Sequence, residues 1–360
     1  MPHFRCSPGC RSSVTLQHMP TYYDQSVRLA SESWRSIRKR RAAPPGLAQG
    51  HRARGQTFQA SLEQAEQQFR SAARIGYESR PLNLFYGLSQ AGRAIAAASP
   101  RCPGGDWQLS GHGISCPNLN ERWSSVTHLK VRADGVNHSS FTRVSKALDS
   151  PVPAEAFDLS LVLPQMLEAT IHSPLGQPLN SAILLSHFPD RLMIAEHGRD
   201  SLFLEIPRRV SNLDPSARGN FDTYLKRFPG LRGAVSNIGV PTENGWPLTE
   251  MSAHLFWDLS QSESLNPHVV RTRSTLYRSH RILLPTAPGV EGNFHPLMIW
   301  WICLYVLSMA ARYSPDQWTK CIDVNRSPEA TSVEYLLDVA IDAVPDLINE
   351  AIDCATQSCT

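Results

Sequence analysis

Apolar residues recur every three or four positions in three stretches near the N-terminus, which is the spacing of an amphipathic helix. These stretches cover residues 22–37, 57–75 and 82–98. The third begins just after Arg80-Pro81, and proline is favoured in the first turn of a helix. Residues 1–20 show no periodicity and predict a disordered tail.

The pattern changes after residue 105. Residues 106–290 contain short apolar runs bounded by turn residues, which predicts a β-rich central region. The clearest runs are 128–132, 181–185, 192–195 and 202–206, and Asp134-Gly135 is a hairpin signal. Helices are expected only near 158–169 and 221–228.

Helical spacing returns in the C-terminal segment 291–360, with helices predicted at 296–312, 329–344 and 345–354, the last two separated at Pro345. Residues 297–311 carry no charge. A membrane span needs about 20 apolar residues, so this run predicts a buried helix and no membrane contact.

These segments predict an α+β fold. The N-terminal helical segment, 21–105, and the C-terminal helical segment are expected to pack together, with 57–99 as the contact, and the central region should sit against them.

Charge is unevenly distributed although the formal net charge is only +3. Seven basic residues and no acidic ones lie within 35–54, and Pro44 and Pro45 favour a basic loop there that folding could spare. Nine acidic and two basic residues follow Tyr313. The basic segment could bind nucleic acid or pair with the acidic C-terminal helices. No aromatic residue between Ile37 and Thr57 is available to stack on bases, which disfavours nucleic acid.

Eight cysteines without a C-x-x-C pair, and an N-terminus without an apolar leader, favour the cytoplasm. Cysteine and histidine spacings do not match a structural zinc site, and the glycine-rich phosphate-binding motifs are missing from the sequence. We therefore predict no metal and no cofactor.

Two stretches carry a family resemblance. They are AARIGYESRPLNLFYGLSQAGRAIAA at 72–97 and HPLMIWWICLYVLSMAARYSPDQW at 295–318. With the intervening His112-Gly113-Ile114, they resemble the YaaC-like family of bacterial proteins over about 20–355. The basic segment 35–54 and Gly92, a poor helix former, depart from that pattern. The resemblance implies a soluble cytoplasmic protein and implies no particular reaction.

Polar residues embedded in the two recognised helices are the main candidates for a binding site. They are Arg80, Tyr86, Gln90 and Arg93 in or beside the first helix, His112 between the helices, and His295 and Arg312 beside the second. Arginine binds anions through planar paired donors, so we expect a polar cleft for a small anionic ligand. In the alternative, Arg80 and Arg312 only bond helix ends or carboxylates.

Catalytic motifs are weak. The R-x(4–6)-H pattern of HEPN-type ribonucleases occurs five times, against roughly three expected by chance. Only the pair Arg273 and His280 precedes a helical region, so these two are weak catalytic candidates.

The sequence therefore favours a non-catalytic binding or regulatory protein that acts through a protein partner or a small anionic ligand, and oligomers are compatible with it. The alternatives are a HEPN-like nuclease or nucleotide-acting enzyme in a defence or stress role, and an enzyme of another class that uses His112 or His295. Whether the chain is an enzyme is left open.

Overall fold

The computed structural model describes most of the two helical segments and parts of the region between them. The described residues are 22–135, 139–166, 168, 183–185, 204–207, 236–237, 252–253, 256–257, 275–283 and 292–357. The predicted tail at 1–20 lies outside them.

Four helices form the N-terminal segment: α1 (Tyr22–Ala42), α2 (Leu47–Gly50), α3 (Arg52–Ala72) and α4 (Arg80–Ala98). The predicted basic loop at 35–54 is wrong. Pro44 and Pro45 break the chain only after Ala42, so the basic residues before them continue α1, and Arg52 and Arg54 begin α3.

The C-terminal segment contains α10 (Pro296–Tyr313), α11 (Pro315–Cys321) and α12 (Ala330–Thr356). The predicted break at Pro345 is wrong, because α12 is one helix with Pro345 buried inside it. An interior proline costs about 3 kcal/mol. The apolar face of α12 that packs on α1, α4 and α10 offsets this cost, and its buried residues include Leu336, Leu337 and Val344.

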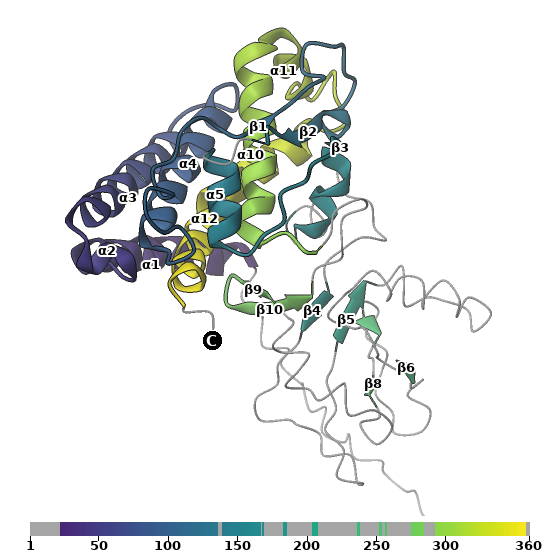
Figure 1. Cartoon of the computed structure of the whole chain (residues 1–360). Helices are drawn as coiled ribbons and strands as arrows, with labels where there is room; N and C mark the ends of the chain where they lie inside the picture. Colours follow the sequence, from purple (N-terminus) through teal and green to yellow (C-terminus); the bar gives the residue numbers. More distant parts are fainter. Residues whose placement is uncertain are drawn as a thin grey trace, which may run out of the picture.

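Helix α4 lies at the centre of the helical body and packs against α3, α10 and α12 (Figure 1). The predicted contact between 72–97 and 295–318 is confirmed. Every residue of α10 from Pro296 to Ala310 is buried, which explains its uncharged run. By length and composition α10 is the one helix of the described residues that could cross a membrane, but 83% of it is buried, as in a core helix.

A small antiparallel sheet follows α4, with the order β1 (Ile114–Ser115), β2 (Lys130–Ala133), β3 (Phe157–Asp158). Between these strands lie the 3-10 turn Val126–His128 and α5 (Ser140–Ala147). A second sheet has the order β7 (Ser252–Ala253), β5 (Leu204–Pro207), β4 (Ile183–Leu185), β10 (His280–Leu283), β9 (Thr275–Tyr277). Strands β6 (Ser236–Asn237) and β8 (Phe256–Trp257) form a separate pair.

The central region matches its prediction in part. Strands lie in the predicted runs at 128–132, 181–185 and 202–206. Helix α5 was not predicted, and two 3-10 turns, Leu159–Leu161 and Leu163–Gln165, stand where a helix was expected, since Pro164 cannot donate to a helical ladder. The predicted run at 192–195 and the predicted helix at 221–228 lie outside the described residues. The described chain is mostly helical with a small antiparallel sheet, and the β-rich nature of 106–290 as a whole stays a prediction.

Candidate functional site

Five of the seven predicted binding residues fall on neighbouring elements of the helical body. Helix α4 carries Tyr86, Gln90 and Arg93 at helical spacings of four and three, which places them on one face. Arg312, in the last turn of α10, donates from Nη1 to the Tyr86 hydroxyl at 2.8 Å. The His112 ring lies 5.4 Å from the Phe85 ring, measured between centroids.

Tyr305 of α10 completes this cluster, because its ring lies 5.9 Å from His112 and 5.3 Å from Phe85. We call the following six residues the α4–α10 site: Tyr86, Gln90, Arg93, His112, Tyr305 and Arg312. Tyr305 lies within the apolar helix predicted at 296–312, and its contact with His112 depends on the tertiary packing.

Backbone constraints at Gly113 fix the position of His112. Gly113 has φ +74°, and a Cβ there would overlap the Ser139 side chain. The His112 carbonyl accepts from the Phe141 amide at 3.0 Å, and Ser140 Oγ donates to the Gly111 carbonyl at 2.7 Å. The His-Gly-Ile element is therefore held on the start of α5 and presents His112 to α4 and α10.

The two arginines of the site bond to neutral acceptors. Arg93 donates to the Leu109 carbonyl at 3.0 Å and Arg312 to a tyrosine hydroxyl, and among the described residues neither pairs with a carboxylate. Eight other arginines of the described chain do pair with carboxylates: Arg38, Arg40, Arg41, Arg70, Arg80, Arg143, Arg278 and Arg326.

The pKa values of His112 and Tyr305 depend on their burial and on the charges near them. Burial lowers the pKa of His112, and the charges of Arg312 and Arg93 lower it further while Asp134 opposes them. Burial, with a smaller contribution from Asp134, raises the pKa of Tyr305. At neutral pH the site therefore combines two guanidinium groups with a neutral imidazole and a neutral phenol, and the Asp134 carboxylate lies near enough to act on His112 and Tyr305.

Arg80 stabilises the packing of helices and lies outside the α4–α10 site. Its Nε donates to the Ala72 carbonyl at 3.0 Å, its Nη2 to the Ile75 carbonyl at 3.0 Å, and its Nη1 to Asp338 of α12. Its guanidinium also lies 4.5 Å from the centroid of the Tyr77 ring. These are the bonds to a helix end and a carboxylate that the structural alternative describes.

His295 caps the opposite end of α10 from Arg312, about 25 Å away along the helix axis. Its Nδ1 accepts from the Leu297 amide at 3.1 Å, and its own amide donates to Ser150 Oγ at 3.1 Å. Burial lowers the pKa of His295 to about 4. His295 is therefore a neutral helix cap and lies away from the α4–α10 site.

The described residues do not show the weak catalytic candidates Arg273 and His280 close together. Arg273 lies outside them, and His280 is described only as the backbone start of β10. Within the described ranges no group of three or more histidine, cysteine or acidic residues could hold a metal ion. The nuclease alternative stays a prediction.

The basic segment makes internal contacts. Arg38 donates from Nε to Glu66 at 3.0 Å, and Arg40 donates to Asp353 of α12 at 2.7 Å. The expected pairing with the acidic C-terminal helices is therefore confirmed for Arg40. Arg54 is buried and donates to the carbonyls of Ala97 and Cys102, at 3.0 and 2.6 Å. Few of the basic residues at 35–54 are thus left to contact phosphates.

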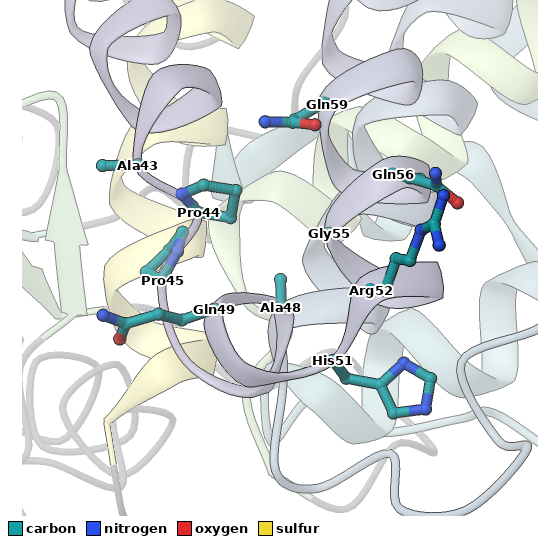
Figure 2. A pocket seen from close by; sticks show the side chains of 10 residues that line it. All are labelled: Ala43, Pro44, Pro45, Ala48, Gln49, His51, Arg52, Gly55, Gln56 and Gln59. Atoms are coloured by element: carbon teal, nitrogen blue, oxygen red, sulfur yellow. The ribbon is translucent and has the colours of Figure 1, made fainter.

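A hollow of about 460 Å³ lies between the end of α1, the short helix α2 and the start of α3. Figure 2 shows Pro44 and Pro45 on one side of it and Gly55 and Gln59 on the other. The lining is largely uncharged, with the exposed Arg52 as its single arginine. The hollow contains none of the predicted binding residues.

A buried charged network around Arg278 was not predicted from the sequence. This residue follows β9, is 6% exposed, and donates to Asp346 at 2.9 Å and to Glu168 at 3.3 Å. The four-residue spacing of acids along α12 includes Asp346 and is a signal for one half of the network. Nothing in the sequence identified the turn after Tyr277, since hairpin turns usually contain Asn or Gly.

Comparison with known proteins gives one match. The model of a family described as YaaC-like Protein matches residues 22–352. No curated protein and no solved structure matches the chain.

Proposed function

The chain belongs to the YaaC-like family, and we propose that it is a binding protein that takes a small anion at the α4–α10 site. A carboxylate or a phosphate is the chemistry that two guanidinium groups bind best, because their paired N–H donors match two oxygen atoms. The neutral His112 and Tyr305 side chains would add hydrogen bonds without adding charge.

One observation carries this proposal. Arg93 and Arg312 have no carboxylate partner among the described residues, whereas Arg80 and Arg278, which both contact α12, do. A guanidinium held in place by a neutral acceptor keeps its remaining donors and its full charge. Arg312 is exposed and Arg93 is half-buried, so an anion can approach from solvent.

The cysteines indicate the compartment in which the protein would bind its anion. A small anion in the cytoplasm would meet a protein whose thiols stay reduced. Burial raises the pKa of Cys303 and Cys321 to about 12, which makes these thiols unreactive. We also propose a cytoplasmic location, because the cysteines of the described residues are free and disulfides are rare in the cytoplasm.

Thermal unfolding with an anion panel tests the proposal. Phosphate, a phosphomonoester and a dicarboxylate, each at constant ionic strength, are compared with chloride. At least one should raise the Tm of the wild-type protein, and the rise should vanish in Arg93→Gln and Arg312→Gln.

The matched control is Arg74→Gln, which removes an exposed arginine just after α3 and away from the site. It should keep the wild-type response. A panel without any anion-specific rise in Tm, or an equal rise in the site variants, would overturn the proposal.

A further inference from the structure

The Asp134 carboxylate lies at the border of the α4–α10 site. The Asp134 amide donates to the Gly113 carbonyl at 3.0 Å, which continues the β1–β2 ladder one residue beyond the pair Ile114 and Ala133. Residue 134 therefore lies opposite the residue that follows His112. Because this ladder is antiparallel and regular, it fixes Asp134 beside the His-Gly-Ile element that presents His112 to α4 and α10.

The side chain of Asp134 is accessible to a ligand. Along β2, Lys130 and Arg132 are exposed whereas Val131 and Ala133 are buried, and Asp134 continues the exposed set at the end of the strand. Within the part of the chain that the structure describes, the carboxylate of Asp134 has no ion pair and no hydrogen bond. Its charge is therefore available for a contact with a bound molecule.

Charges of both signs lie near the half-buried His112 ring. Burial has the largest effect on its pKa; among the charges, those of Arg312 and Arg93 lower that pKa and that of Asp134 raises it. Asp134 also adds to the effect of burial in raising the pKa of Tyr305, whose ring lies 5.9 Å from that of His112. The site therefore offers two cations and one anion to a ligand that binds beside His112.

A ligand that matches both signs of charge carries an anionic group and an ammonium group. Guanidinium groups bind a carboxylate or a phosphate through paired N–H donors, and a free carboxylate binds an ammonium through charge-assisted hydrogen bonds. The neutral imidazole of His112 adds one acceptor nitrogen for an N–H donor. A plain anion, in contrast, is attracted by the two arginines and repelled by Asp134.

We propose that the ligand of the α4–α10 site is a small zwitterion, such as a free amino acid, whose anionic group binds Arg93 and Arg312 and whose ammonium group binds Asp134. This inference rests on the proposed anion-binding function and narrows the class of ligand. The anionic group is a carboxylate or a phosphate, and the ligands compared below distinguish the two. Their chain lengths also vary, so that the separation of the two charges can match that of the site.

Pairs of ligands that differ by one amino group test the proposal. Propionate is compared with β-alanine, butyrate with γ-aminobutyrate, succinate with aspartate, and ethyl phosphate with phosphoethanolamine. Affinities for the full-length protein are measured by isothermal titration calorimetry at neutral pH and constant ionic strength. In at least one pair the amino compound should bind about five- to tenfold more tightly, which is the effect of one charged contact at an exposed carboxylate.

Asp134→Asn should change the two affinities of that pair in opposite directions. The amino compound should bind about five- to tenfold more weakly, because its ammonium loses a charged partner. The plain anion should bind as tightly as before or more tightly, because a repulsive charge is removed. Arg93→Gln should weaken both members of the pair. A merely structural role for Asp134 would weaken both ligands alike, so the opposite changes are specific to the proposed contact.

Asp158→Asn is the matched control, because Asp158 of β3 lies opposite Lys130 at the other end of β2. It should keep the wild-type preference for the amino compound. Plain anions that bind as tightly as their amino partners in every pair, or a preference that persists in Asp134→Asn, would overturn the zwitterion and leave the anion site standing. A protein that binds none of the eight compounds would overturn both proposals.

Discussion

The indole of Trp301 occupies the space that a side chain at residue 92 would need. A Cβ placed on Gly92 would lie 2.5 Å from Trp301 Cζ3 and 3.0 Å from Val144 Cγ2. Gly92 therefore lets α10 approach α4 closely. Its position in the middle of a helix is explained by this packing and not by helix propensity.

Gly92→Ala should destabilise the protein by about 1–2 kcal/mol. Alanine improves helix propensity by about 1 kcal/mol, but the overpacking against a fully buried tryptophan costs more. Urea unfolding followed by circular dichroism measures the difference. Gly50→Ala is the control, because a Cβ at Gly50 has no atom within 4 Å, and it should leave stability nearly unchanged.

Substitution by glutamine should reduce stability but not anion binding at Arg80, and anion binding but not stability at Arg312. Arg80→Gln removes bonds to two carbonyls and to Asp338, so we expect a loss of about 2–3 kcal/mol in unfolding free energy. Arg312→Gln should cost under about 0.5 kcal/mol, because its side chain is exposed. Anion binding should persist in the folded Arg80 variant and be lost in the Arg312 variant. The reverse pattern would contradict this division.

Sequence periodicity predicted α3, α4 and α10 and their contact, because each helix buries a continuous apolar surface. It failed where local signals compete with packing. Pro345 predicted a helix end, but α12 continues through it since its apolar face is buried. The basic segment suggested a solvated loop, whereas buried Glu66 pairs with Arg38 and Arg41, and Asp353 pairs with Arg40.

The types of residue in the candidate site could be predicted from the sequence, but which of the predicted residues belong to the site could not. The sequence grouped Tyr86, Gln90 and Arg93 with Arg80 as polar residues in or beside one helix, and it could not separate Arg80, which faces α12. It could not place His295 at the far end of α10 as a cap, because a histidine before a proline has many structural roles. The partners of a polar side chain depend on which elements meet, and that is decided by tertiary packing.

The segment 39–54 should be necessary for folding, contrary to the expectation from its sequence. Arg54 alone satisfies the carbonyls of Ala97, Cys102 and Gly104 and lies 5.3 Å from the Trp107 ring centroid. Arg54→Gln should cost about 2–3 kcal/mol, because it leaves buried carbonyls unpaired. Arg52→Gln, two residues away and exposed, should cost under about 0.5 kcal/mol.

Deleting 39–54 removes both the end of α1 and the start of α3 and should abolish the cooperative unfolding transition. Circular dichroism and size-exclusion chromatography measure this outcome. A deletion variant that unfolds cooperatively at the wild-type Tm would show that the segment is dispensable.

Acid should destabilise the protein through His295. Its pKa is lowered by burial from 6.5 to about 4, so the folded state binds fewer protons than the unfolded state in this window. Its contribution to stability is complete above about pH 6.5 and is lost as the pH falls toward 4, by about 2–3 kcal/mol. Protonation also removes the Nδ1 acceptor that caps α10.

His295→Asn separates these effects, because asparagine keeps a capping oxygen and does not titrate. The variant should retain most of the stability at pH 7 and lose the steep part of the decline between pH 6.5 and pH 4. His128→Asn, on an exposed imidazole, should leave the wild-type decline unchanged. Unfolding free energies measured in urea at several pH values give the slope. A His295→Asn protein with the wild-type slope would show that other groups govern acid unfolding.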